Sequence, residues 1–271
     1  MDDTVLCQKF ATMGAALRRT NAVRPRRRFA APGPFALDVQ AGLQGEFFVL
    51  GVRPGTPVEV AVVDIRPADR HLLLLVREGG ESHHFLCGHD ERHWFVAAIP
   101  ESVAGVNTVK AAMEALKPAE VQQAQAEKGV RGKDLRRRRN AAYVRQGEWF
   151  FLPAPHLRVD MRVVLRNEPI VRGDGGKPHY AEFCHRSGGE EVHVCRQYPN
   201  GLLAREFTRL VEANPKLKKL FWRRMVRNAD VYVKGQVRHA DHKTIGLRCW
   251  HKVLMNTESQ SKALENVAFL D

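Results

Sequence analysis

One short pattern occurs twice in this chain, and it constrains the fold more than any other feature of the sequence. Residues 44–48 read QGEFF, and residues 146–150 read QGEWF, 102 positions later. A second match follows in the same order, because REGGE at 77–81 corresponds to RSGGE at 186–190. A glycine-rich loop at 172–178 accounts for the longer spacing of the second match. We interpret the pattern as two copies of one module of about 55 to 60 residues.

Each copy is predicted to consist mainly of β-strands. Aromatic residues at 148–152 favour a strand, and the Gly-Gly pairs at 79–80 and 188–189 suit the two-residue turn of a β-hairpin. In the second copy, such a turn would pair Cys184 with His193 and Glu182 with Cys195.

Other segments carry apolar residues at helical spacing. These predicted helices span residues 4–19, 109–116, 118–129, 203–211 and 215–227. Two alternating strands, 231–238 and 244–254, follow as a hairpin. We therefore expect an α+β fold with two related β-rich modules, an internal duplication, intervening and following helices, and a C-terminal β-hairpin.

The same patterns divide the chain into five parts. They are an N-terminal helix with a basic arm (1–40), the first β-rich module with a helical segment (41–127), a basic linker (128–142), the second β-rich module (143–200), and basic helices with the final hairpin (201–271).

Charge indicates the kind of partner. The chain holds 43 Lys and Arg against 30 Asp and Glu, a net charge of +13, and the excess is concentrated in residues 1–30, 128–145 and 205–252. Clustered cations attract phosphates and release their counterions, whereas charge that serves only solubility is scattered. We expect a non-catalytic protein that binds nucleic acid. RNA or another single strand is preferred, because aromatic residues lie among the cations on the last two strands.

The expected contacts fall into three groups. Arginines of the arm and linker would bind phosphates, basic residues of the helix 215–227 would extend that surface, and Tyr232 and Trp250 would stack on bases among the cations of the final hairpin. The full set is Arg24, Arg26, Arg27, Arg28, Arg136, Arg137, Arg138, Arg139, Lys218, Lys219, Arg223, Arg224, Arg227, Tyr232, Lys234, Arg238, Arg248, Trp250 and Lys252.

No cofactor is expected, and zinc is the alternative considered. The predicted hairpin would place Cys184, His193 and Cys195 on one face, although the chain lacks a Cys-x-x-Cys pair. A fourth ligand could come from His179, His185, His239, His242 or Cys249.

Two other functions stay open. A metal-dependent nuclease needs histidines and carboxylates beside a basic surface. Its candidate groups are His89, Asp90, Glu91 and His93, or Asp241 with His239 and His242. The second alternative is a structural or assembly protein whose duplicated modules form an interface while the basic arm touches nucleic acid.

Location and assembly are constrained only in part. No run approaches the roughly 18 apolar residues of a membrane span, and the first residues lack the pattern of a signal peptide. We expect a cytoplasmic protein with reduced cysteines and no membrane partner, whose oligomeric state is open.

Overall fold

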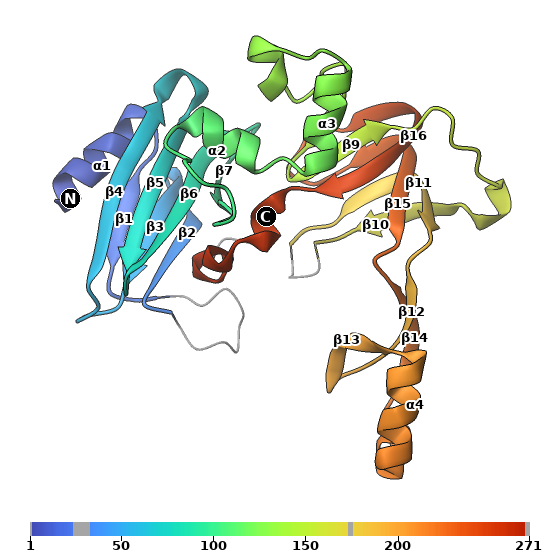
Figure 1. The fold of residues 1–271 in the computed structure, drawn as a ribbon. Coiled ribbons are helices and arrows are strands. Elements are labelled where there is room, and N and C mark those ends of the chain that lie inside the picture. Colours follow the sequence, from blue (N-terminus) through green and yellow to red (C-terminus); the bar gives the residue numbers. More distant parts are fainter. Residues whose placement is uncertain (1, 24–32, 173–175, 269–271) are drawn as a thin grey trace.

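The computed structural model describes residues 2–23, 33–172 and 176–268 and has a mixed α+β fold, as predicted (Figure 1). Four sheets, in which antiparallel pairing dominates, carry most of the chain. None of the helices in these ranges is long and apolar enough to cross a membrane.

Two sheets pack face to face to form the N-terminal sandwich (Figure 1). The first has the order β1-β3-β2, and the second is an antiparallel meander, β4-β5-β6-β7. Alternate side chains of both sheets, such as Phe48, Leu72 and Phe85, are fully buried between them. The strands are β1 (Leu17–Thr20), β2 (Phe35–Gly42), β3 (Gly45–Val52), β4 (Val58–Arg66), β5 (His71–Glu78), β6 (Glu81–Asp90) and β7 (His93–Ala98).

The first helix is shorter than the predicted 4–19. Helix α1 (Asp3–Thr12) buries Leu6 and Phe10 against the sandwich and then stops, because Gly14 adopts a φ of +81°. The chain continues as β1, which pairs in parallel with β3. Arg18 and Arg19 therefore lie on a strand and not in the last turn of a helix.

Two helices connect the meander to the rest of the chain, in agreement with the sequence, and the first of them covers the outer face of the meander. Helix α2 (Val109–Ala115) packs on Leu73 and Leu86. Helix α3 (Ala119–Glu127) begins after Pro118 and ends before Gly129, and its Val121 packs on the next sheet. Local signals were sufficient here, since a cap and a stop flank each apolar face.

The third sheet has six antiparallel strands in the order β10-β11-β15-β16-β9-β8. The predicted C-terminal hairpin is present as β15 and β16, and it occupies the middle of this sheet. Phe151, Ala181 and Val233 belong to its buried face. The strands are β8 (Val144–Gln146), β9 (Trp149–Pro153), β10 (Leu165–Ile170), β11 (His179–Ser187), β15 (Asp230–Arg238) and β16 (Ile245–Met255).

Residues 188–229 form a protruding unit that extends away from the six-stranded sheet (Figure 1). Its three strands have the order β13-β12-β14, and helix α4 follows β13. The bounds are β12 (Glu190–Cys195), β13 (Tyr198–Leu203), α4 (Ala204–Ala213) and β14 (Arg223–Arg227).

Two predictions about this region were wrong. The segment 215–227 is not a helix, because a 3-10 turn (Pro215–Lys219) is followed by β14, which pairs with β12. The Gly-Gly pair 188–189 does not close a hairpin either. Cys184 pairs with Leu165 and Val233, so the expected Cys184–His193 partnership is absent. Both predictions relied on local sequence patterns, and both failed because these segments pair with strands that are distant in the sequence.

The two repeated patterns can be compared directly. Both QGE segments sit at hairpin turns, between β2 and β3 and between β8 and β9. Gly79-Gly80 joins β5 to β6 as predicted, whereas Gly188-Gly189 leads from one sheet to another. The two segments thus share one turn and differ in their strand neighbours, so the structure does not show the predicted duplication.

The C-terminal segment returns to the sandwich. Its 3-10 turns (Thr257–Gln260 and Lys262–Asn266) bring Ala263 and Val267 into the sandwich core. Glu101 accepts hydrogen bonds from Ser261 Oγ at 2.9 Å and from the backbone N–H of Ala263 at 3.1 Å. Other 3-10 turns are Pro67–Asp69, Gly132–Arg136 and Met161–Val163.

Candidate functional site

The protruding unit carries a dense basic surface. Residues 190–227 hold nine Lys and Arg against four Asp and Glu. Helix α4 has no buried residue, so its cations face solvent. The exposed cations of the unit are Arg196, Arg205, Arg209, Lys216, Lys218, Lys219, Arg223 and Arg224. Arg227 is partly buried and binds the Glu190 carboxylate at 3.0 Å.

Aromatic rings lie among these cations. Trp222 stacks on Tyr198 with ring centroids 5.5 Å apart and meets Phe207 edge-on at 4.9 Å. Phe207 in turn stacks on His193 at 4.1 Å. These rings hold the unit together, whereas the neighbouring Phe221 is 96% exposed. An open ring beside cations has the composition of a stacking platform for unpaired bases.

Phe221 and Trp222 were missed by the sequence analysis. Phe221 and Met225 lie in the segment 215–227 that was predicted as a helix, and both are exposed. The signal was the sequence KLKKLFWRR, in which two adjacent aromatic residues lie between cations. The helical interpretation concealed it.

The predicted face of the final hairpin is partly covered by the protein itself. Trp250 is only 8% exposed, which corrects the expectation of an open ring. Lys252 binds the carboxylates of Glu120 and Asp230 at 2.9 and 3.2 Å, and Arg238 donates to Asn167 Oδ1 at 2.6 Å. Tyr232 is half-buried, and the cations Lys234 and Arg248 are exposed.

The other predicted arginines have different environments. Arg24 and Arg26, Arg27 and Arg28 lie outside the described residues. Arg137 pairs with Asp134 at 2.9 Å. Arg138 forms ion pairs with Asp90 and Glu91, and burial lowers its pKa to about 10. Arg136 is half-buried and Arg139 is exposed. Arg138 therefore joins the linker to the sandwich.

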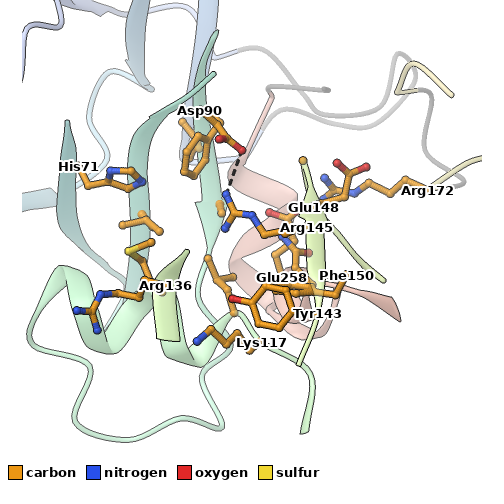
Figure 2. A pocket seen from close by; sticks show the side chains of 18 residues that line it. His71, Asp90, Lys117, Arg136, Tyr143, Arg145, Glu148, Phe150, Arg172 and Glu258 are labelled. Atoms are coloured by element: carbon orange, nitrogen blue, oxygen red, sulfur yellow. Dashed lines mark hydrogen bonds and ion pairs between the residues drawn. The ribbon is translucent and has the colours of Figure 1, made fainter. Parts of the chain in front are cut away.

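A cavity of about 80 Å³ lies where the sandwich meets the six-stranded sheet (Figure 2). Lys117 lines it and donates to Glu114 at 2.6 Å and to the Leu135 carbonyl at 2.8 Å. Arg145 binds Asp90 at 3.0 Å, and burial lowers the pKa of both Lys117 and Arg145. These two cations are already bound to groups of this chain, which indicates a structural junction.

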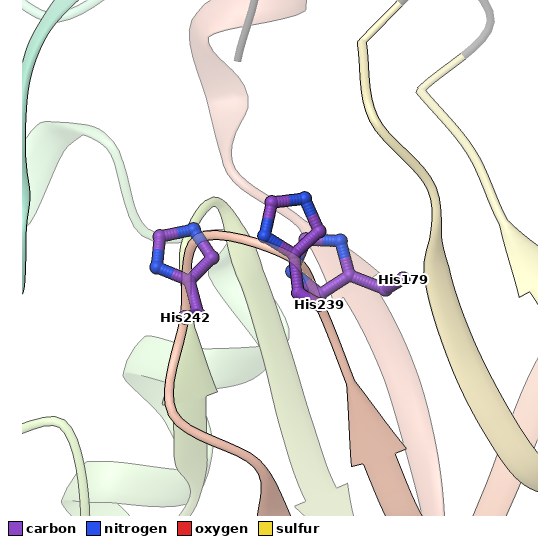
Figure 3. Close-up of side chains that lie close together, drawn as sticks. All are labelled: His179, His239 and His242. Carbon is purple, nitrogen blue, oxygen red and sulfur yellow. The ribbon is translucent and has the colours of Figure 1, made fainter.

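Three histidines meet beside this junction (Figure 3). His179 begins β11, and His239 and His242 belong to the connection between β15 and β16. The rings of His179 and His239 stack at 4.1 Å, and those of His239 and His242 stack at 4.7 Å. We refer to these three residues as the histidine cluster. His179 and His242 are buried, and His239 is partly exposed.

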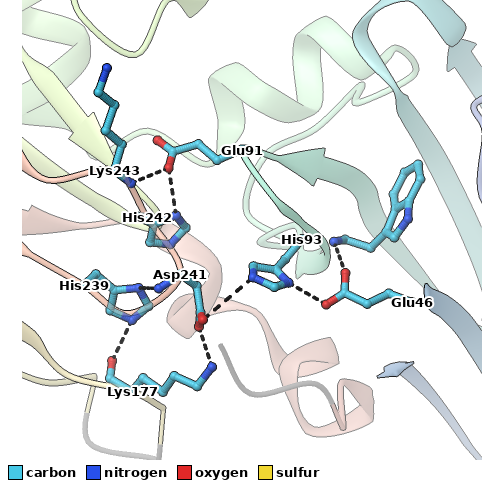
Figure 4. Close-up of polar contacts among 9 residues, drawn as sticks. Glu46, Glu91, His93, Lys177, His239, Asp241, His242 and Lys243 are labelled. Atoms are coloured by element: carbon cyan, nitrogen blue, oxygen red, sulfur yellow. Dashed lines mark hydrogen bonds and ion pairs between the residues drawn. The ribbon is translucent and has the colours of Figure 1, made fainter. Parts of the chain in front are cut away.

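Glu91 and His93, from one of the residue sets considered for a nuclease, approach the other set at the histidine cluster (Figure 4). Asp90 of the first set binds Arg138 and Arg145 instead. His93 Nε2 lies 3.7 Å from Asp241 Oδ1, and Glu91 Oε2 lies 3.7 Å from His242 Nδ1. Glu91 also accepts a hydrogen bond from the Lys243 backbone N–H at 2.6 Å. Hairpin turns of the sandwich and of the six-stranded sheet bring these groups together.

Charges around the cluster are balanced locally. Burial acts to raise the pKa of Asp241, but the hydrogen bond and charge of Lys177, 2.6 Å away, outweigh it and hold that pKa below its ordinary value. His93 Nδ1 lies 2.6 Å from Glu46 Oε1, within the first QGE segment. Both carboxylates are therefore engaged by cationic or potentially cationic partners.

The cysteine set considered for zinc is not assembled. Cys184 lies in the six-stranded sheet, while His193 and Cys195 lie in the protruding unit. Burial raises the pKa of the Cys184 thiol to about 11, which disfavours the thiolate that a metal requires. Within the described ranges, the histidine cluster is the group of such side chains whose ligand atoms all lie within 4.8 Å of one another.

Comparison of the chain with protein family models, with curated proteins and with solved structures found no significant match.

Proposed function

We propose that the protein binds nucleic acid through the protruding unit, without catalysis, and prefers RNA or another single strand. The proposal rests mainly on one observation: the unit has an exposed basic surface, and the side chain of Phe221 is exposed among its cations. Cations contribute attraction to any phosphate backbone, and an exposed ring adds stacking that requires unpaired bases.

The shape of the unit supports this assignment. It extends from the rest of the molecule, so several of its faces are accessible to a strand at once (Figure 1). Lys218, Lys219, Arg223 and Arg224 flank Phe221 in the sequence and are exposed. A strand following this surface would place phosphates on the cations and one base on the ring.

The test is a salt titration of the affinity for labelled single-stranded RNA, single-stranded DNA and duplex DNA. The variant replaces Lys218, Lys219, Arg223 and Arg224 by Ala. Each lost phosphate contact should reduce the salt slope for single strands by about 0.7, with a large loss of affinity.

The matched control removes the same charge elsewhere. It replaces Lys9, Arg77, Lys110 and Arg158, which are exposed outside the unit, by Ala. The control variant should keep most of the affinity and slope. Equal losses in the two variants would mean that net charge, and not the protruding unit, attracts the nucleic acid.

Stacking is tested separately with Phe221→Ala. Loss of one stacked base weakens single-strand binding by about 1 to 3 kcal/mol and leaves duplex binding nearly unchanged. An equal loss on both substrates would remove the preference for single strands from the proposal.

A further inference from the structure

We infer that the histidine cluster is a binding site for a divalent transition-metal ion of the zinc type. Three imidazoles are the protein ligands of one common class of zinc site, in which a fourth position stays open to water or another ligand. His179, His239 and His242 offer ligand atoms that all lie within 4.8 Å of one another. The inference is independent of the proposed nucleic-acid binding.

The nitrogens of two of these rings border one space. An ideal Cβ built on Gly147 would lie 2.8 Å from His242 Nε2 and 3.6 Å from His179 Nε2. Gly147 has a φ of +56° in the turn between β8 and β9, a conformation that favours glycine. The absence of a side chain at this position leaves room beside the two nitrogens.

The surrounding groups match the outer shell of a metal site. Metal-binding histidines commonly direct their second nitrogen toward a carboxylate or a carbonyl group. His242 Nδ1 lies 3.7 Å from the Glu91 carboxylate, so its Nε2 is the atom directed to the metal. The carboxylates of Glu91 and Asp241 lie beside the cluster, and each is paired with a cation of this chain, Arg138 and Lys177 respectively.

The side-chain amide of Gln146 holds the loop that carries two of the proposed ligands. Gln146 Nε2 donates to the Lys243 carbonyl at 2.8 Å and lies 3.4 Å from the Val237 carbonyl. These contacts connect the turn at Gly147 to both ends of the connection that contains His239 and His242. The ligands are therefore positioned by a buried hydrogen-bonded frame.

Ligation requires ring rotation. Zinc bonded to three nitrogens at 2.0–2.1 Å holds them about 3.3 Å apart, and the nearly parallel rings of the cluster do not yet converge. His239 must change most, because its Nδ1 accepts from the Asp241 N–H at 3.1 Å and its Nε2 lies 3.3 Å from the Lys177 carbonyl. The proposal therefore requires rotation about the side-chain bonds of these histidines, between staggered rotamers.

The experiment is a titration of the metal-free protein with Co²⁺ and then Zn²⁺, followed by visible absorption and by competition with a chromophoric chelator. We expect one ion per chain, with a visible Co²⁺ spectrum that Zn²⁺ displaces. Nitrogen ligation also predicts no near-ultraviolet thiolate-to-cobalt band, which distinguishes this site from one that uses Cys184 or Cys195.

The variants are His179→Ala and His242→Ala, and each should weaken binding by more than about 100-fold, beyond the effect of a typical outer-shell partner. Gly147→Ala tests the same space without removing a ligand and should also weaken binding. Matched controls are His156→Ala, at an exposed site, and His193→Ala, from the rival cysteine group. Both should bind like the unchanged protein.

Three outcomes overturn the inference. The first is that the folded protein binds no stoichiometric metal ion. The second is that metal binding survives in both His179→Ala and His242→Ala. The third is that His193→Ala loses metal binding. Should a histidine variant fail to fold, His179→Gln and Gly147→Ala provide the comparison, with circular dichroism as the check on folding. Because nucleic acid is absent from the assay, its result does not depend on the proposed function.

Discussion

The N-terminal sandwich and the protruding unit are both rich in strands, but they place their apolar side chains differently. In the sandwich, large side chains such as Phe48, Leu72 and Phe85 are completely buried between two sheets. Among the described residues of the protruding unit, only Val192 and Cys195 are buried, while Phe221 and Met225 face solvent. The sandwich is thus stabilised by removing apolar area from water, and the unit by strand pairing and ring stacking.

Under the proposed function, this difference separates the part of the chain that carries most of the stability from the part that would bind nucleic acid. A surface that contributes little to the core can carry cations and an open ring at little cost to folding. The following predictions test the separation, beginning with the largest expected effect.

Phe48→Ala should destabilise the protein by about 3 to 5 kcal/mol, because it removes a buried ring and leaves a cavity. Phe48 meets Phe10 at 5.1 Å and Trp94 at 5.4 Å between ring centroids. Urea unfolding followed by far-ultraviolet circular dichroism measures the loss. A change below about 1 kcal/mol would contradict the view that this core dominates stability.

Gly51→Ala should cost about 1 to 3 kcal/mol, as overpacking does. A Cβ at this position in β3 would collide with the Ala22 carbonyl, so backbone must shift. Gly246→Ala in β16 is the matched control, since a Cβ there meets no atom within 4 Å. The control should change the free energy of unfolding by no more than about 0.5 kcal/mol.

The free energy of unfolding should depend on pH because His71 in the sandwich and His251 in the six-stranded sheet are buried. Burial, more than any other cause, lowers the pKa of His71, and the same holds for His251. The unfolded chain therefore binds these protons more readily than the folded one, so stability is complete above about pH 6.5 and declines as the pH falls toward the lower folded pKa.

The contribution of His71 is measured with His71→Gln in urea titrations at several pH values. One such proton changes the free energy of unfolding by at most about 1.4 kcal/mol per pH unit, and the variant should show a shallower decline. His156→Gln, at an exposed position, should keep the original slope. A steeper decline in His71→Gln would reverse the assigned sign.

Phe221→Ala has the smallest expected effect on stability, within about 0.5 kcal/mol, because its ring is almost fully exposed. The same variant is expected to lose single-strand affinity. Thermal unfolding and binding measured on one preparation compare the two effects. A large loss of stability would show that Phe221 belongs to the packing of the unit.

The sequence predicted the elements that local signals determine. Helices α2 and α3 are flanked by Thr108, Pro118 and Gly129, and the β15–β16 hairpin follows from alternation within two adjacent segments. The predictions failed where a strand pairs with a segment that is distant in the sequence. Residues 223–227 form a strand because they pair with the free edge of β12. Gly188-Gly189 connects two sheets and does not close a hairpin, because β10 and β15 already pair with the two edges of β11.

The candidate sites show the same contrast between features set by local sequence and features set by distant strand pairing. The basic character of the protruding unit is visible in the sequence, since its cations gather in one segment of the chain, but the exposure of Phe221 depends on the absence of a helix. The histidine cluster was not visible as a unit. His179 and His239 are brought together only by the pairing of β11 with β15, and Gly147 reaches them through the turn of a third segment.

The connection of the protruding unit to the six-stranded sheet has an evolutionary consequence. The chain leaves β11 at Ser187 and re-enters β15 at Asp230, and these two residues are direct cross-strand partners. A two-residue turn could therefore close β11 and β15 into a plain hairpin without altering the register of the sheet. Residues 188–229 have the architecture of an insertion, which a lineage can acquire, exchange or lose while the histidine cluster and the sandwich remain in place.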